Sequence, residues 1–380
     1  MRIMRKQIAV AHPNLMEKGG AEAVAMHIIE SIQDKHDVTI ISLISPDIGE
    51  LNDWFDTDVS TDVSLISPSP LIQRFFQRID RCHLLKTSFL SNFTQSHIDS
   101  YDLIVSSYNE MSISTNSVQY LDAPQYQRWR DHESTLWLKP YNAVCSLIES
   151  YSPDTIMSNT IIANSRWTAN RVSQTYREPD YIVYPPINTN NIYQSPWQDR
   201  ENGFLCIGRV SPAKKQLRCI KILNNIRNNG HDVHLHIAGP VGDQEYAEKV
   251  KSRAKKYDYI HFDGELSRSE ILEMIATHRF GIHGKSNEHF GIVIAEMVAG
   301  GIVPFIPDGG GQTEIVGPNP NLVYSDPDDA VQKIDRVLSN PEIQRAILDS
   351  MKDREEEFGV NRFKEKINKI ICQELNTCNE

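Results

Sequence analysis

Two glutamates stand close together in a glycine-rich segment of the second half, and they are well suited to bind a polar ligand. Glu288 precedes a stretch typical of a helix, 291–299, and Glu296 lies inside it. A carboxylate accepts two hydroxyl donors at once, which suits the diol of a ribose or a pyranose. The glycines at 309–311 let backbone amides approach a phosphate or sugar. Such glutamates also occur on solvated helix faces, but the surrounding glycines favour a binding site.

A second set of candidate residues is cationic. Arg209 and Lys214 come directly after the apolar run 203–208, which reads as a strand. Fixed cations stabilise the negative charge of phosphate groups, and the planar guanidinium suits phosphate oxygens. The alternative is a basic surface loop. The position immediately after a strand favours the functional interpretation.

The first half offers weaker candidates. Gly19 and Gly20 stand between a first strand and an amphipathic helix, where backbone amides at a helix N-terminus could face a phosphate. A lone pair of glycines is more often just a turn. His132, in the polar segment 124–133, is a further polar candidate, and an ordinary surface position is its alternative.

Alternating strands and helices must position these residues, and the apolar pattern predicts them. In the first half we expect a helix over 21–32 and strands over 7–11, 36–43, 102–106 and 160–164. In the second half we expect strands over 203–208, 233–238, 260–262, 280–283 and 302–306, and helices over 216–228, 246–256, 267–277 and 291–299. Such alternation is typical of α/β proteins with doubly wound parallel sheets.

A chain of 380 residues exceeds one ordinary core, so two domains are expected. A Pro- and Asn-rich stretch without periodicity, 184–197, reads as the linker between them. We therefore predict an N-terminal domain over 1–190 and a C-terminal domain over 191–360. The remaining 361–380 contains a helical pattern that is expected to pack back on the N-terminal domain.

Together these motifs resemble the retaining glycosyltransferase family 4. Glu288 and Glu296 match its two-glutamate signature, and Arg209 and Lys214 match its basic motif. The resemblance covers about residues 8–316. It implies the GT-B fold: two Rossmann-like domains face each other across a cleft, with the acceptor on the N-terminal domain and a nucleotide sugar on the C-terminal one.

The resemblance also implies roles for individual residues. Glu296 would bind the ribose of the donor nucleotide, and Glu288 the transferred sugar. The catalytic residues would be Arg209, Lys214, Glu288 and His132. The donor-binding residues would be Gly19, Gly20, Arg209, Lys214, Glu288, Phe290, Gly291, Ile292 and Glu296.

Within the family, the motifs look most like the mannosyltransferases that extend dolichol-linked oligosaccharides. The expected reaction moves mannose or another hexose, with retention, from a GDP- or UDP-linked donor to a glycan or lipid-linked acceptor. One alternative is a nucleotide-sugar 2-epimerase of the same fold. Another is a non-catalytic protein that binds sugar nucleotides or glycans.

Neither a metal nor another cofactor is expected. Two Asp-x-Asp sequences, Asp56–Asp58 and Asp326–Asp328, are interpreted as solvated loops, with Arg209 and Lys214 taking the place of a metal. The six cysteines form no CxxC pair, which indicates reduced thiols and a cytoplasmic protein. The net charge of −11 argues against general nucleic-acid binding.

A membrane contact is the remaining question. No apolar stretch reaches the roughly 20 residues of a membrane span. The segment 71–93, however, combines apolar residues at helical spacing with four basic ones. It is expected either to lie as an amphipathic helix on an anionic membrane or to pack on the protein's own sheet.

Overall fold

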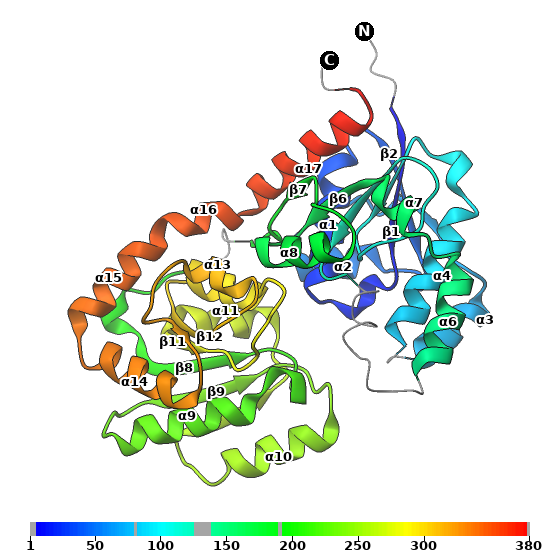
Figure 1. Ribbon diagram of the computed structural model, residues 1–380. Helices are drawn as coiled ribbons and strands as arrows, with labels where there is room; N and C mark the ends of the chain where they lie inside the picture. Colours follow the sequence, from blue (N-terminus) through cyan, green and yellow to red (C-terminus); the bar gives the residue numbers. More distant parts are fainter. Residues whose placement is uncertain (1–4, 80–81, 125–137, 189–191, 378–380) are drawn as a thin grey trace. The chain divides into compact units, whose positions relative to one another are not determined.

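The computed structural model describes residues 5–79, 82–124, 138–188 and 192–377. The chain divides into two compact units (Figure 1). The first comprises Met1–Pro186 and Val360–Glu380, and the second comprises Ile187–Gly359. The division falls inside the stretch that reads as a linker, close to the domain boundary expected at residue 190.

A parallel sheet runs through the first unit, with β1 and β4 near its centre. In the described residues its seven strands lie in the order β3 (Ser64–Ile66), β2 (Asp37–Ser42), β1 (Gln7–His12), β4 (Leu103–Ser106), β5 (Ser117–Leu121), β6 (Thr160–Ala163) and β7 (Tyr181–Ile182). The helices are α1 (Gly20–Ile32), α2 (Ile48–Phe55), α3 (Pro70–Arg78), α4 (His83–Gln95), α6 (Leu138–Glu149), α7 (Pro153–Met157), α8 (Arg166–Thr175) and α17 (Val360–Glu374), with short 3-10 turns at Leu15–Glu17 and Ile98–Ser100.

Strand β1 shows why this sheet is covered on both faces. Its residues from Ile8 onward are all buried. Ile8 and Val10 belong to one apolar cluster, whereas Ala9 and Ala11 belong to another. Because successive side chains of a strand point to opposite faces, a strand apolar at every position must have packing partners on both sides.

The last helix, α17, belongs to the first unit, as expected for the segment after residue 360. Phe363, Ile367, Ile370 and Ile371 are buried in the same cluster as residues of α1 and β1. Each such side chain contributes about 1.5–3 kcal/mol by leaving water. Lys364 adds an ion pair to Glu30 of α1, at 2.8 Å. The chain therefore returns to the first unit after completing the second.

The second unit has a parallel sheet of its own. In the described residues its six strands lie in the order β10 (Ile260–Gly264), β9 (His234–Ala238), β8 (Glu201–Ile207), β11 (His278–Ile282), β12 (Val303–Pro307) and β13 (Val323–Tyr324). The helices are α9 (Gln216–Asn228), α10 (Gln244–Ala254), α11 (Arg268–Thr277), α12 (Ile292–Ala299), α13 (Gln312–Val316), α14 (Pro327–Leu338), α15 (Pro341–Met351) and α16 (Glu355–Phe358), with 3-10 turns at Trp197–Asp199, Pro212–Lys214 and Lys352–Arg354. The expected α/β class with two Rossmann-like sheets is confirmed.

The segment 71–93 is not one continuous helix. Helix α3 ends at Arg78 and α4 begins at His83. Phe76 is 2% exposed and belongs to a cluster against which Ile72, Ile79 and Phe89 pack. Most of the apolar face thus covers the protein's own sheet. Among the described residues, no helix combines the length and apolar composition that a membrane crossing requires.

Candidate functional site

The candidate site of the second unit lies where β8, β11 and β12 end. These strands are neighbours in the sheet, and all run in the same direction. Arg209 and Lys214 follow β8, Glu288 follows β11, and the glycines 309–311 follow β12. Open parallel sheets bind ligands at this carboxyl edge. Four groups proposed from the sequence are therefore carried by loops at one edge of one sheet.

Glu288 is the centre of an ion cluster. Its Oε2 lies 2.6 Å from Lys214 Nζ and 3.2 Å from His283 Nε2, and its Oε1 lies 2.9 Å from Lys285 Nζ. The Glu288 side chain is 12% exposed, against 28% for Lys214 and 23% for Lys285. The structure thus brings together two of the residues expected to be catalytic, Lys214 and Glu288.

The electrostatics of the cluster keep Glu288 charged. Burial alone would raise the pKa of this carboxyl, but the hydrogen bond from His283 and the charges of Lys214 and Lys285 outweigh burial and hold the pKa well below its usual range. Burial lowers the pKa of His283, and Glu288 only partly offsets that effect. A neutral imidazole therefore donates its Nε2 proton to a carboxylate that two ammonium groups flank.

Two glycines allow the backbone to come this close. A Cβ at Gly284 would lie 2.8 Å from the carbonyl oxygen of Lys214 and 2.7 Å from that of Lys215. Gly310 forms a bridge with Glu288, and its φ of 89° lies in the left-handed region. A Cβ at Gly310 would lie 2.3 Å from Glu288 O. Larger residues at either position would push the loops apart.

The guanidinium of Arg209 has no neutralising partner among the described residues. Arg209 is exposed, and its guanidinium makes no hydrogen bond or ion pair within that part of the chain. The backbone beneath it is fixed, since its carbonyl accepts a hydrogen bond from Gln216 at 3.0 Å. A Cβ at Gly242 would meet Arg209 Cγ and Cδ at 2.7 Å, so the stem of the side chain lies against that glycine.

Glu296 lies on α12, among the residues that the protein buries. It is 8% exposed, and its Oε1 pairs with Arg268 Nη2 of α11 at 2.7 Å. Gly291, with φ of 103°, immediately precedes this helix, and Ile292 is its first residue. Phe290 is buried and packs edge-on against Phe358, with ring centroids 5.5 Å apart. The helix thus begins one residue later than expected.

The remaining candidates belong to the first unit. Gly19 caps α1, of which Gly20 is the first residue, and Gly19 N donates to Glu22 Oε2 at 2.7 Å. Glu22 Oε1 lies 3.1 Å from His12 Nε2. These two side chains line a small pocket with Asn14, Glu17, Lys86 and Tyr108 among its other lining residues. The expected His132 lies outside the described residues.

Sequence reasoning missed His283, Lys285 and Gln312. Gln312 is buried and donates to the carbonyls of Lys285, Pro307 and Gly309, each at 3.0 Å, so it joins two loops of the site. Their position could have indicated them, because His283 and Lys285 come just after a buried strand. Of the acidic pairs, Asp326 caps α14 by accepting from the amides of Asp328 and Asp329.

Comparison with known proteins relates the second unit to a family of glycosyltransferases. Residues 188–354, nearly the whole second unit, match the family model described as "Glycosyl transferases group 1". The second unit therefore carries a group 1 glycosyltransferase domain, which covers less than half of the chain. The resemblance to glycosyltransferase family 4 proposed from the motifs is confirmed, and the family is one of enzymes.

Curated relatives point to one subgroup. The chain is 23% identical over 298 residues to the GDP-Man:Man(3)GlcNAc(2)-PP-Dol alpha-1,2-mannosyltransferase of Dictyostelium discoideum, covering 71% of this chain and 56% of that protein. The mouse protein of the same description is 25% identical over 180 residues, which cover 43% of this chain and 37% of the relative. The chain thus spans about half the length, or less, of these relatives.

Solved structures agree on the fold. The Anabaena protein HepE in complex with UDP-glucose superposes with a TM-score of 0.71 at 16% identity, covering 97% of this chain and 100% of that one. WaaG, a glycosyltransferase of lipopolysaccharide biosynthesis, gives 0.72 at 15% identity, covering 96% and 99%. At these identities the likeness shows the GT-B fold alone.

Proposed function

We propose that this group 1 glycosyltransferase transfers a hexose, with mannose as the first candidate, from a GDP- or UDP-linked donor to a lipid-linked or other glycan acceptor, with retention at the anomeric carbon. The observation that carries the proposal is the cluster at the carboxyl edge of the second sheet. There a largely buried Glu288 pairs with two lysines, and Arg209 follows the same edge with no hydrogen-bond or ion-pair partner for its guanidinium among the described residues.

In the proposed glycosyl transfer, each charged group of the site has a separate role. Cleavage of the donor's anomeric bond leaves negative charge on the diphosphate, and Arg209 and Lys214 stabilise it. Glu288, ionised and held in place, accepts hydrogen bonds from hydroxyls of the transferred sugar. Glu296 does the same for the ribose. Because the cations already provide the positive charge, we propose that the transfer step requires no divalent metal.

The relatives support the identity of the substrates. The Dictyostelium and mouse relatives act, by their descriptions, with GDP-mannose on a dolichol-linked oligosaccharide. We extend this to a nucleotide-sugar donor and a lipid-linked acceptor for the present chain. The five described cysteines are all free, which is usual in reducing compartments and supports our proposal that the protein acts on the cytoplasmic side.

A donor screen tests the proposal. The full chain is incubated with GDP-mannose, other GDP-sugars and UDP-sugars, each with and without extracted polyprenyl-linked oligosaccharides, and released nucleotide and glycosylated product are both measured. We expect one donor to give acceptor-dependent release, and an α-linked product from an α-linked donor by NMR. Conversion of donor to its 2-epimer without any transfer product would instead identify the epimerase.

A pair of lysine variants tests the site. Lys214→Met should lower kcat/KM about 100- to 1,000-fold, the usual effect of removing one group that stabilises transition-state charge. Lys221→Met is the matched control, because Lys221 is exposed on α9 of the same unit and should leave activity unchanged. Equal activity of the two variants would contradict the proposed role of the cluster.

Metal independence is tested separately. Activity is measured after exhaustive treatment with EDTA and without added divalent ions, and then with Mg²⁺ or Mn²⁺ restored. We expect full turnover under chelation. A complete loss that Mg²⁺ or Mn²⁺ reverses would show that the cations of the site do not suffice.

We also propose that α3 touches an anionic membrane. Leu71 is 77% exposed and Phe75 is 51% exposed, and Arg74 and Arg78 are exposed on the same helix. Exposed apolar side chains among basic ones suit an anionic lipid surface. Co-sedimentation with phosphatidylserine-containing liposomes should fall with salt and with Phe75→Ser. The same change at Val241, 43% exposed in the second unit, should have no effect; an equal loss would rule the surface out.

A further inference from the structure

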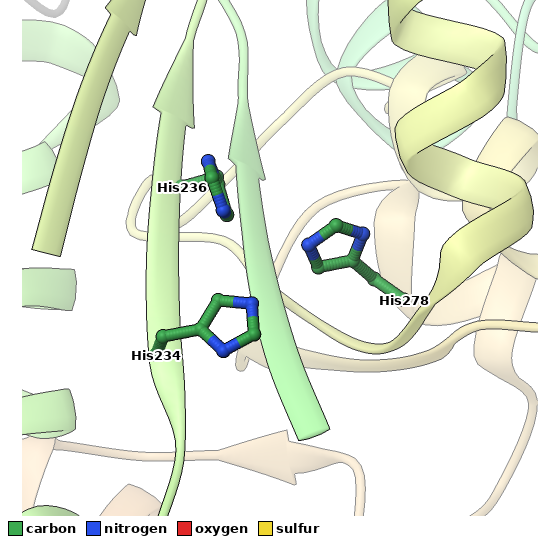
Figure 2. A group of neighbouring side chains, drawn as sticks. All are labelled: His234, His236 and His278. Carbon is green, nitrogen blue, oxygen red and sulfur yellow. The ribbon is translucent and has the colours of Figure 1, made fainter. Parts of the chain in front are cut away.

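Three histidines lie together at the amino ends of strands in the second sheet, opposite the carboxyl ends that carry the candidate glycosyltransferase site. His234 and His236 are on β9 and His278 begins β11. The ligand-competent ring nitrogens of all three lie within 4.8 Å of one another. Figure 2 shows the three imidazoles turned toward a common space, each with a ring nitrogen facing the others.

The strand between them makes this meeting possible. Strand β8 separates β9 from β11, and its Gly203 pairs with His234 in register. A Cβ at Gly203 would lie 2.3 Å from His234 Nε2 and 2.4 Å from His278 Cδ2. Any side chain here would therefore occupy the space of the rings. The glycine leaves room above the central strand in which two histidines from non-adjacent strands approach each other.

The outer hydrogen bonds fix which nitrogen of His278 and His236 faces inward. His278 Nδ1 lies 2.9 Å from the carbonyl oxygen of Met274, and His236 Nδ1 lies 3.1 Å from both carboxylate oxygens of Asp263. A carbonyl and a carboxylate can only accept, so each Nδ1 carries the proton and each Nε2 keeps its lone pair. Histidines that bind metals almost always have such an outer partner.

Two of the inward nitrogens make no hydrogen bond within the described part of the chain. Nε2 of His278 and Nε2 of His234 are both buried and lack a hydrogen-bond partner among the described residues. A carboxylate oxygen, Glu201 Oε2, lies 3.4 Å from His234 Nε2.

We propose that His234, His236 and His278 bind a divalent transition metal, Zn²⁺ in the first instance, through their Nε2 atoms, with Glu201 as the anionic fourth ligand. Zn–N bonds of about 2.0–2.1 Å in a tetrahedral site place ligand nitrogens roughly 3.3 Å apart, so small side-chain rotations close the trio around the ion. Three imidazoles and one carboxylate form a ligand set that zinc accepts.

The metal would be structural. It joins β9 to β11 across β8 at the amino ends of the strands, whereas the proposed catalytic cations follow the carboxyl ends. It therefore goes beyond the proposed glycosyl transfer and is independent of it. It also departs from the sequence-based expectation of no metal, which concerned the Asp-x-Asp pairs and the cysteines.

Metal uptake by the full, untagged chain is the direct test. The protein is dialysed against a chelator, loaded with Zn²⁺ and freed of excess ion, and its zinc content is measured by elemental analysis. We expect one Zn²⁺ per chain, and Co²⁺ loading should give the visible absorption bands of a tetrahedral site. A wild-type content well below one, or a Co²⁺ spectrum of an octahedral ion, overturns the proposal.

Variants locate the site. His278→Gln and His236→Gln should lose the bound metal, and Asp263→Asn, which touches only the outer nitrogen of His236, should weaken Zn²⁺ binding about 10- to 100-fold. His261→Gln is the matched control, because that exposed histidine stacks on His236 at 4.7 Å but is not a proposed ligand. If His278→Gln fails to fold, Asp263→Asn decides. Unchanged Zn²⁺ affinity in Asp263→Asn and His236→Gln would refute the assignment.

Discussion

The bridge between Gly310 and Glu288 gives the sharpest test of how the candidate site is built. In Gly310→Ala the new Cβ would lie 2.3 Å from Glu288 O and 2.5 Å from Glu288 N, where an ordinary contact needs at least 3.4 Å. Both neighbours are backbone atoms, so a side-chain rotation cannot relieve the collision. The glycine loop must move by about 1 Å, and the hydrogen bond from Gly311 N to Glu288 O, 2.8 Å long, is lost.

The expected loss of folding stability in Gly310→Ala has two parts. A non-glycine residue at a φ of 89° costs about 1–2 kcal/mol, and the lost hydrogen bond with the displaced loop adds about 1–2 kcal/mol. We therefore expect the free energy of unfolding of the second unit to fall by about 2–4 kcal/mol. A displacement of 1 Å at a site of this kind lowers turnover about 100-fold.

Gly230→Ala is the matched control for this change. Gly230 follows α9 in the same unit with a φ of 96°, and a Cβ there would meet nothing within 4 Å. It should cost only the backbone strain of about 1–2 kcal/mol and leave activity unchanged. Denaturant unfolding measures the stability, and nucleotide release from the donor measures turnover. Equal turnover of Gly310→Ala and Gly230→Ala would refute the reasoning.

Two further predictions concern side-chain placement and pH. Gly242→Ala should push the stem of Arg209 aside and lower kcat/KM about tenfold while the melting temperature changes little, because the neighbour is a mobile side chain; a wild-type kcat/KM would speak against a role for Arg209. Burial raises the pKa of Glu30, but His27 and Lys364 outweigh burial and lower it from 4.5 to about 2. This stabilisation is therefore present above pH 4.5 and lost as pH falls toward 2, so the deficit of Glu30→Gln should be about 1 kcal/mol at pH 7, after allowance for solvent screening, and vanish near pH 2; a deficit that does not depend on pH would contradict it.

Most helices and strands of the second unit lie where the sequence predicts them. Helix α9 has the bounds expected for it, and Ser267 with Glu270 forms a capping box at the start of α11, where a helix was expected from residue 267. These elements have strong local signals: a buried apolar strand, an amphipathic helix and a recognisable cap. Such signals depend on neighbours within a few residues, which a sequence displays directly.

The first unit was harder to predict because its missed elements lack such signals. Strand β5, Ser117–Leu121, is buried at every position although it contains Ser117 and Gln119. Gln119 satisfies both ends of its amide against the backbone of Met111, a partner eight residues earlier. A sequence shows the polar residue but not its buried partner, so the pattern reads as a loop.

Residues that meet only through the fold were missed for the same reason. Lys285 and His283 reach Glu288 because the loop after β11 turns back on itself, and Glu288 in that loop is bridged to Gly310 in the loop after β12. His278 is 44 positions from His234, and they meet only because β8, with a glycine, separates their strands. The sequence does show that His234 and His236, two residues apart in a strand, lie on the same face, but it does not show that His278 joins them.

The ion cluster also suggests why the protein would bury a glutamate among lysines. A lysine side chain loses about 2 kcal/mol of rotamer freedom when a phosphate fixes it, and Glu288 imposes that loss on Lys214 and Lys285 before any donor arrives. Arg209 has no such partner in the part of the chain that the structure describes, but its planar guanidinium loses less freedom for each hydrogen bond that it forms. Two lysines, one arginine and one glutamate leave a formal charge of +2. On the proposed function, this net positive charge offsets part of the negative charge of the leaving diphosphate, in groups that the protein has already placed.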